Sequence, residues 1–356
     1  MAAPAQTSFE SARAAFPVLE HLAYLNAGTN GPLARATAEA MIAEQLVDLA
    51  KGRGGEPYFS RVLAMRGELR AKLAGLLSVA PEQIALTRST TDGCNLVVAG
   101  LGLGPEDEVV TSDEEHFGLL GALEVSPAQV KAVPADRILE AVTDRTRLIA
   151  VSHVSWVSGN LLEPERLKAE TALPVLVDGA QSVGAIPVEA SKVDFYTVSG
   201  QKWLCGPDAT GCLVVADPAE LGLAFPTYFA QTEHEPDGSF VPREGAERFD
   251  TGWIGGSILA GLAAALDEAP DWRFERVAAM AALCRERLAE RFEVVTKPGQ
   301  AGLVSFRPDG DPTELVASLR ERGVVVREIP RRGLIRVSCG YWTSEEDLDR
   351  LLAALG

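Results

Sequence analysis

The residues best suited to chemistry are an aspartate and a lysine that each follow an apolar run. The run LPVLVDGA (173–180) contains Asp178, and the run VDFYTVSG (193–200) is followed by Lys202 in a loop of small residues. Near-continuous apolar runs predict strands buried on both faces, and α/β proteins bind ligands at the carboxyl ends of such strands. A carboxylate buried there needs a positive partner. A lysine buried there becomes a nucleophilic amine, because desolvation lowers its pKa.

Pyridoxal phosphate is a cofactor that needs both groups. It binds a lysine as a Schiff base and takes an acid beside its pyridine nitrogen, so that the ring can accept electrons. Its phosphate needs a cradle, and RSTTDGCN (88–95) leads into a helix predicted over 94–103. Hydroxyl and backbone N–H groups at a helix N-terminus bind anions. Further phosphate donors flank the lysine: Ser199 and Gln201.

Structural alternatives exist for each of these residues. The aspartate could cap a helix, and the lysine could lie on a surface loop. The hydroxyl residues of the segment could be simple N-caps: Ser89, Thr90 and Thr91.

Two of the four histidines follow predicted strands. His116 comes after the run 107–113 and could stack on a flat aromatic ring or cap the helix predicted over 117–125. His153 lies near the end of the run 147–154 and could orient the site or satisfy a local carbonyl. The spacing of the histidines and of the five cysteines predicts neither a metal site nor a disulfide framework.

The order of the predicted elements indicates two domains. Further strands are predicted over 84–87 and 211–217, and strands alternate with helices up to about residue 220, which favours an α/β class with a mainly parallel sheet. The last hundred residues read as a small α+β domain, with helices predicted over 272–292, 312–323 and 344–355 and strands over 302–308, 324–329 and 334–340. We expect three segments: 1–20 packing with the small domain, 21–256 as the large cofactor-binding domain, and 257–356 as the small domain.

Composition excludes several classes of function. The chain has 356 residues, 47% of them hydrophobic, which rules out disorder as a description of the whole chain. Its formal net charge is −17, which argues against nucleic acid or an anionic membrane surface as a partner. The beginning, MAAPAQTSFE, lacks the features of a signal peptide, and no apolar stretch approaches the length of a membrane span. A cytoplasmic protein is therefore expected.

Four motifs connect these residues to a known family. They are DGAQSVG (178–184), SGQKW (199–203), TTDG (90–93) and RFD (248–250). With them the chain resembles the class V aminotransferase group of fold-type I pyridoxal phosphate enzymes, which includes cysteine desulfurases, isopenicillin-epimerase-like proteins and cystine C–S lyases. The resemblance runs from residue 21 to the final helix. It implies a large domain with a mainly parallel, seven-stranded-type sheet, a small α+β domain, and a homodimer whose active sites lie at the interface.

The resemblance also implies roles for individual residues. Lys202 would bind the cofactor covalently and move the α-proton, while Asp178 would pair with the pyridine nitrogen. His116 would stack on the ring, and Gln181 would hydrogen-bond its phenolic oxygen. Arg336 would clamp the substrate α-carboxylate through two parallel hydrogen bonds. The implied phosphate ligands are Thr91, the amide of Asp92, Ser199 and Gln201.

One departure from the family pattern concerns cysteine. Desulfurases of this family carry a nucleophilic cysteine shortly before the carboxylate-binding arginine, but residues 324–335 contain none. Cys339 comes three residues after Arg336, and the alternation of a strand places it with Ile335 and Val337 on the opposite face. We therefore expect that Cys339 does not carry sulfur.

A second departure is aromatic. Trp156 stands where the family often has an asparagine, and Trp253 stands where a partner-subunit threonine is expected, with Thr251 two residues earlier. The two tryptophans predict a reshaped substrate site, with Trp156 binding substrate, or packing at a dimer interface.

Together these features favour a lyase. The expected reaction is β-elimination on L-cystine or a cysteine S-conjugate, giving pyruvate, ammonia and a sulfur product. The alternatives are a cysteine desulfurase using Cys339 or an external thiol, a hercynylcysteine sulfoxide lyase, an epimerase, an aminotransferase or, least favoured, a non-catalytic relative.

Overall fold

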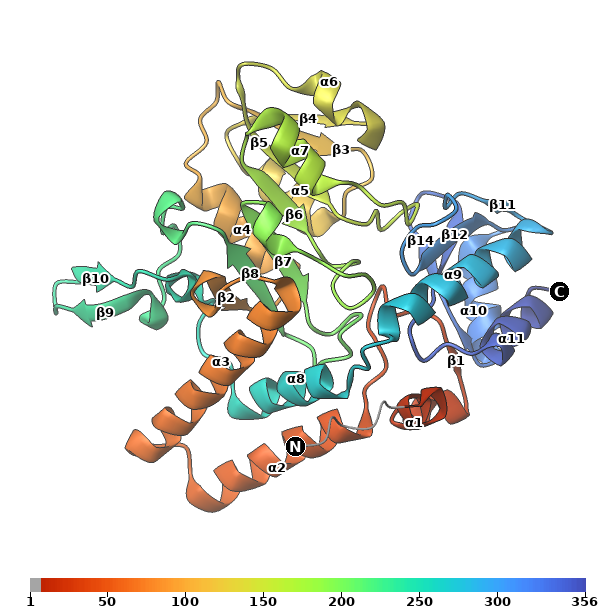
Figure 1. The fold of residues 1–356 in the computed structure, drawn as a ribbon, viewed down its shortest axis with the longest axis horizontal. Coiled ribbons are helices and arrows are strands. Elements are labelled where there is room, and N and C mark those ends of the chain that lie inside the picture. The colour runs from red at the N-terminus through yellow and green to blue at the C-terminus, as the bar shows by residue number, and fades with distance from the viewer. Residues whose placement is uncertain (1–7) are drawn as a thin grey trace.

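A seven-stranded sheet forms the centre of the computed structural model, which describes residues 8–356 (Figure 1). The strand order is β2-β8-β7-β6-β5-β3-β4. The strands are β2 (Ile84–Thr87), β3 (Glu108–Ser112), β4 (Gln129–Val133), β5 (Thr146–Ser152), β6 (Val175–Asp178), β7 (Phe195–Ser199) and β8 (Gly211–Val215). Strands β4, β3, β5, β6 and β7 pair in parallel, and β8 is antiparallel to both of its neighbours. The α/β class with a mainly parallel sheet is confirmed.

Helices cover both faces of this sheet, as continuous apolar strands require. Adjacent strand residues enter different cores: Val177 packs with α3 and α8, whereas Leu176 packs with α4 and α5. The helices of this part are α2 (Arg35–Lys51), α3 (Gly55–Leu77), α4 (Thr90–Gly100), α5 (Phe117–Glu124), α6 (Ile138–Ala141), α7 (Pro164–Thr171) and α8 (Gly256–Glu268). The 3₁₀ helices are η1 (Pro17–Glu20), η2 (Pro81–Gln83), η3 (Ala135–Arg137), η4 (Ala190–Lys192), η5 (Pro218–Glu220), η6 (Tyr228–Ala230) and η7 (Ala246–Phe249).

The start predicted for the helix near Cys94 is wrong. Helix α4 begins at Thr90, and the Ser89 hydroxyl caps it by accepting a hydrogen bond from the Asp92 amide at 3.1 Å. The apolar pattern reveals only the buried face of a helix, whereas the cap residue determines where the helix begins. The TTDG motif is therefore the first helical turn.

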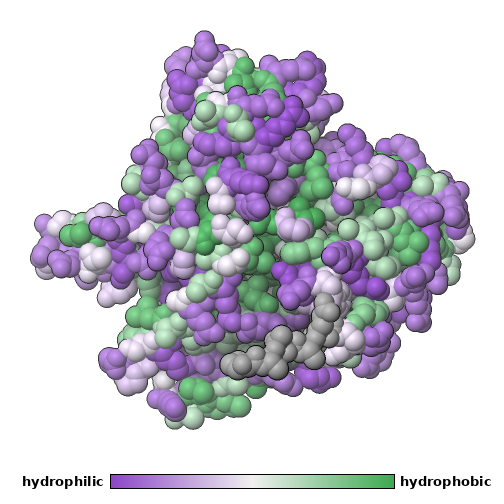
Figure 2. Space-filling model, viewed as in Figure 1, coloured by the Kyte–Doolittle hydropathy of each residue, from purple (hydrophilic) through white to green (hydrophobic). Residues whose placement is uncertain are grey.

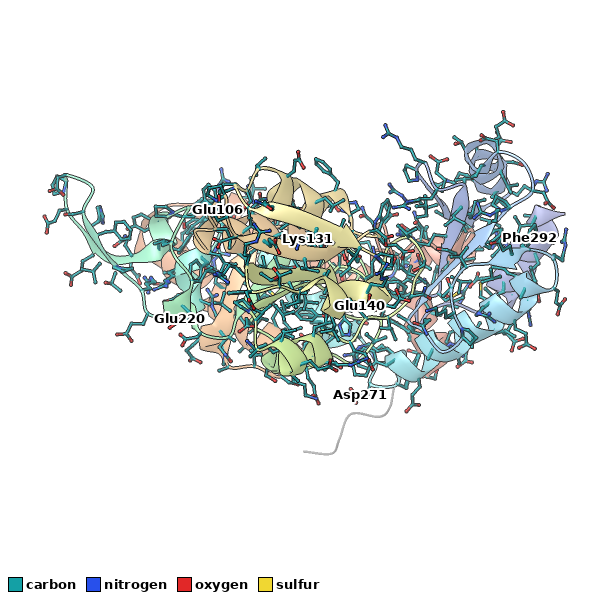
Figure 3. All side chains as sticks on the ribbon, turned by 90° about the horizontal axis from the view of Figure 1, so that it is seen from above. Glu106, Lys131, Glu140, Glu220, Asp271 and Phe292 are labelled. Carbon is teal, nitrogen blue, oxygen red and sulfur yellow. The ribbon has the colours of Figure 1, made fainter. Side chains whose placement is uncertain are left out.

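A second sheet forms the C-terminal part. Strands β11 (Glu293–Val294), β12 (Leu303–Arg307), β15 (Leu334–Ser338) and β14 (Arg327–Ile329) pair antiparallel in this order. Helices α9 (Arg273–Ala289), α10 (Pro312–Glu321) and α11 (Glu345–Leu355) pack on it. Seen from above, Phe292 of this part lies well apart from Lys131 and Glu140 of the large-sheet part (Figure 3). The run predicted as one strand over 324–329 is split, because β13 (Val324–Val325) pairs with β1 (Ala23–Tyr24).

Of the segment predicted over 1–20, residues 1–7 lie outside the described residues, and the first described helix contacts the C-terminal part. In α1 (Phe9–Ala14), the Arg13 guanidinium bonds the Asp347 carboxylate at 2.7 Å. By contrast, α8 packs on α2 and α3 on the large-sheet side, although the predicted boundary assigns residues 257–268 to the small domain. The division at residues 20 and 256 stays a prediction.

A hairpin of β9 (Gln231–His234) and β10 (Phe240–Pro242) projects from the large-sheet part (Figure 1). Within residues 8–356, no helix has the length and apolarity needed to cross a membrane.

Candidate active site

Lys202 lies in a tight turn directly after β7. The turn is closed by the Cys205 amide, which donates to the Lys202 carbonyl at 3.0 Å. Gly31 packs closely against this turn. Its amide donates to the Gln201 carbonyl at 2.8 Å, and a Cβ on it would lie 2.2 Å from the Lys202 carbonyl oxygen. Burial lowers the pKa of Lys202 to about 8; Asp178 opposes this shift and Arg336 adds to it. The structure therefore presents an amine that is easily deprotonated.

Asp178 lies on the neighbouring strand, at the carboxyl end of β6. It is buried, and its Cα is in register with Thr197 of β7. One carboxylate oxygen, Oδ1, accepts the Ala180 amide at 2.8 Å, so the residue does cap the turn that follows it. The charge of Asp178 also acts on Lys202, where it favours the protonated amine. The acid and the amine of the site are therefore electrostatically coupled.

The N-terminus of α4 meets the end of β7. The Thr90 amide donates to the buried Ser199 hydroxyl at 3.4 Å. Thr91 is exposed, and its hydroxyl lies beside Gly118 of α5, where a Cβ would be 2.5 Å away. The side-chain oxygen of Gln201 is buried and has no hydrogen-bond partner among the described residues. The Asp92 amide, a predicted phosphate ligand, already donates to Ser89.

His116 is the N-cap of α5. Its Nδ1 accepts the Gly118 amide at 3.0 Å, and its exposed ring meets the Trp156 ring edge to face, with 5.0 Å between centroids. Desolvation by the surrounding protein and the charge of Lys202 lower the pKa of His116. Because the cap uses Nδ1, the Nε2 atom of His116 is not engaged by it and can face a ligand.

Gln181 and Arg336 meet around Gly28. The Gln181 amide donates to the Gly28 carbonyl at 2.8 Å and accepts from the Trp203 indole at 3.1 Å. A Cβ on Gly28 would lie 2.8 Å from an Arg336 nitrogen and 2.9 Å from the Gln181 oxygen. The segment around Gly28 thus lies directly against the side chains of Gln181 and Arg336 and connects the large-sheet part to the C-terminal sheet.

Arg336 is a buried guanidinium without an acidic partner in residues 8–356. It donates to the Trp156 carbonyl at 3.0 Å and reaches the Thr29 hydroxyl at 3.5 Å, while its Nε has no described partner. Burial and the charge of Arg327 lower the pKa of Arg336 to about 9. An uncompensated buried cation favours binding of an anion.

Arg327 is the residue that sequence reasoning missed. It faces Arg336 across the β14–β15 pair, and it donates to the same Thr29 hydroxyl at 3.4 Å. The short hairpin between the two arginines was the available signal, because strands joined by a tight turn bring such residues opposite one another. Two guanidinium groups thus converge on one hydroxyl.

Three further residues singled out in the sequence lie elsewhere. His153 bonds the Tyr196 hydroxyl at 2.7 Å rather than a carbonyl. Trp253 is an exposed residue that stacks on Phe229 at 5.9 Å. Cys339 is fully buried among the apolar side chains of the C-terminal core, on the face of Ile335 and Val337 as predicted.

Comparison with known proteins gives a consistent result. The model of the family Aminotransferase class-V matches residues 50–351. Isopenicillin N epimerase from Streptomyces clavuligerus is 28% identical over 397 residues, with 99% of this chain and 98% of that protein covered. Cysteine desulfurase CsdA from Escherichia coli is 28% identical over 397 residues, with 96% of each covered. The cystine C–S lyase C-DES, solved with its product cysteine persulfide, superposes with a TM-score of 0.90 at 27% identity, covering 96% of this chain and 98% of that one.

Proposed function

The chain belongs to the class-V aminotransferase family and is a pyridoxal-phosphate-dependent enzyme, and within that family we propose that it is a C–S lyase acting on L-cystine or another cysteine S-conjugate with a second anionic group. The observation that carries the proposal is the pair Arg327 and Arg336, two guanidinium groups that share one hydroxyl partner and have no acidic partner in residues 8–356.

The residues of the site fit the cofactor. Lys202 has a lowered pKa, and Asp178 is a buried acid one strand away. The α4 N-terminus, with Ser199 and Thr91, offers hydroxyl and N–H donors to a phosphate. When bound, the cofactor supplies an electron sink that makes the substrate α-proton acidic.

In the proposed mechanism Lys202 would hold the cofactor and move the proton from the substrate Cα. Asp178 would pair with the pyridine nitrogen, and Gln181 would hydrogen-bond the phenolic oxygen. His116 would contact the ring face, and Arg336 would hold the α-carboxylate. The phosphate ligands would be Thr91, Ser199 and Gln201, with the Asp92 amide joining them only by releasing Ser89.

Arg327 would bind the anionic group on the leaving half of the substrate. L-Cystine carries a second carboxylate there, whereas L-cysteine does not. The electron pair left by the Cα proton would form the Cα–Cβ double bond, and the pair of the Cβ–S bond would leave with sulfur. The balance is L-cystine and water to pyruvate, ammonia and cysteine persulfide. Trp156 would line this half of the pocket, where its indole N–H has no partner among the described residues.

Elimination is supported over desulfuration by the position of Cys339. A persulfide carrier needs an accessible thiolate, but Cys339 has no exposed surface, and contact with Cys284 and burial raise the pKa of its thiol. The full-length similarity to isopenicillin N epimerase favours a second candidate, an epimerase that returns the proton to Cα without elimination. Exchange of the substrate α-proton with deuterium from the solvent, without pyruvate, would identify it.

We also propose a homodimer with shared active sites. Large apolar side chains are exposed along α2, with Leu49 81% and Leu46 57% exposed. Figure 2 shows hydrophobic surface at the lower edge of the molecule, where α2 lies in Figure 1. A second copy would bury this surface. A cytoplasmic location stays a prediction.

Product analysis tests the proposal. We expect the holoenzyme to release pyruvate from L-cystine in preference to L-cysteine, and C339A to do so at an unchanged rate. Alanine as the product would establish desulfuration instead. Loss of the yellow colour in K202A would identify the cofactor lysine, and a colourless wild type that takes up no added cofactor would contradict the site assignment.

A further inference from the structure

A buried carboxylate lies beside the candidate site without a role in the proposed mechanism. Glu115 directly precedes His116, in the segment between β3 and α5, and it is 5% exposed. Its neighbour Glu114 points elsewhere and accepts hydrogen bonds from the Ser155 and Ser158 hydroxyls. Glu115 is therefore the charged group of this segment closest to the sheet.

Its two carboxylate oxygens bond the carboxyl ends of two neighbouring strands. The Ser112 hydroxyl at the end of β3 donates at 2.5 Å, and the Ser152 amide at the end of β5 lies 3.0 Å from both oxygens. The Ser152 hydroxyl donates as well. No arginine or lysine forms an ion pair with Glu115 in the described part of the chain. The Ser152 amide is a donor, and each serine hydroxyl can donate to a carboxylate oxygen or accept from a protonated one.

Ser152 connects Glu115 to the cofactor side of the sheet. Its Cα is in register with Asp178 of β6, so one residue lies between the two carboxylates. The charge of Asp178 adds to burial in raising the pKa of Glu115 to about 7. Among the described residues, the Cys94 thiol of α4 also interacts with Glu115, and its pKa is raised by burial and by both carboxylates.

We propose that Glu115 is a positioning residue, whose carboxylate ties the ends of β3 and β5 together and so fixes the backbone that presents His116 and Asp178 to the cofactor. A residue serving packing alone needs no polar group at this place, because an apolar side chain would avoid the desolvation of a buried carboxyl group. A carboxyl group hydrogen-bonded to Ser112 and Ser152, by contrast, holds both strand ends in one arrangement. The proposal rests on the assignment of His116 and Asp178 to the cofactor site, but not on the identity of the substrate.

The test uses the holoenzyme and the variants E115Q and E115A, with D113N as the matched control. Asp113 is an exposed acid two residues away, so D113N makes the same acid-to-amide change outside the hydrogen bonds that join Glu115 to Ser112 and Ser152. The first readout is the visible circular dichroism of bound pyridoxal phosphate, which reports how the ring is held. The second is the pH dependence of its visible absorbance, and the third separates kcat from KM with L-cystine.

We expect E115Q to remain folded and to bind the cofactor, with its visible dichroism reduced by half or more and the midpoint of the absorbance titration displaced. We expect kcat to fall roughly tenfold to a hundredfold with KM nearly unchanged, because a misplaced ring loses rate rather than binding. E115A should lose more, and D113N should match the wild type in all three readouts. If E115A fails to fold, S112A, which removes a single donor, should show the same changes on a smaller scale.

Wild-type dichroism and kcat in E115Q would overturn the proposal, as would equal changes in D113N. If L-cystine proves not to be a substrate, the dichroism and the titration still decide the role of Glu115, so the failure of the lyase proposal and the failure of this one are distinguishable.

Discussion

Replacing Arg327 by glutamine separates the two anions that we assign to the substrate. Arg327 and Arg336 both contact the Thr29 hydroxyl, at 3.4 and 3.5 Å, and only Arg336 is fully buried. We assign the α-carboxylate to Arg336 and the anion of the leaving half to Arg327. The R327Q variant therefore keeps binding of the amino-acid end and loses one contact to the distal end.

The structure sets the size of the effect. A hydrogen bond between charged groups contributes about 1.5–3 kcal/mol, and about 1.4 kcal/mol corresponds to a factor of ten. We therefore expect kcat/KM for L-cystine to fall roughly 10- to 100-fold in R327Q. For a cysteine S-conjugate with a neutral leaving group, the fall should stay below about threefold, because no charged contact is lost. The fold should not suffer, since Arg327 is a like charge that lowers the pKa of Arg336.

The assay is pyruvate release from L-cystine and from S-methyl-L-cysteine, measured side by side. R331Q is the control, because Arg331 is an exposed arginine of the same hairpin. An equal loss for both substrates in R327Q would refute the assignment of the distal anion. So would a loss of the same size in R331Q, which would indicate general electrostatic attraction in place of a contact.

Three further outcomes are expected. The first concerns Lys202, whose pKa is lowered to about 8. When pyridoxal phosphate is added to the apoenzyme, the rate of recovery of the visible band should rise with pH, with a midpoint near 8. A midpoint near the pKa of an ordinary lysine would contradict a desolvated site. Because the pKa of Glu115 is raised from 4.5 to about 7, the folded state holds its proton more tightly than the unfolded chain, so wild-type stability should fall as pH rises from about 4.5 to 7. The free energy of unfolding of E115Q should lack this term of about 3 kcal/mol, and parallel curves for the two proteins in urea denaturation from pH 4.5 to 8 would refute the shift. In D250N the free energy of unfolding in urea should fall by about 3–5 kcal/mol. Asp250 is buried between Arg66 at 2.6 Å and Arg70 at 2.9 Å, and its replacement leaves two buried cations unpaired. A fall below about 1 kcal/mol would show that the cluster is solvated.

Local patterns were sufficient for the class of the fold and for the positions of two candidate site residues at strand ends. Continuous apolar runs identify strands buried on both faces, so β6 and β7, and the positions of Asp178 and Lys202 at their carboxyl ends, could be predicted from the order of the residues alone. Alternation along β15 likewise separated Arg336 from Cys339, because successive side chains of a strand point to opposite faces. These features depend only on neighbours in the chain.

Contacts between distant segments were decided by the tertiary structure. The approach of Gly28 to Arg336 joins residues more than three hundred positions apart, and no periodicity encodes it. The convergence of Arg327 on Arg336 depends on the register of two strands, and the role of Glu115 depends on β3 and β5 being neighbours in a sheet. Residue type and burial pattern are local properties, so the order of the residues alone was enough to predict which groups are candidates for the chemistry. Only the folded chain decided which groups face one another, because strand register and the closure of long loops depend on the packing of the whole molecule.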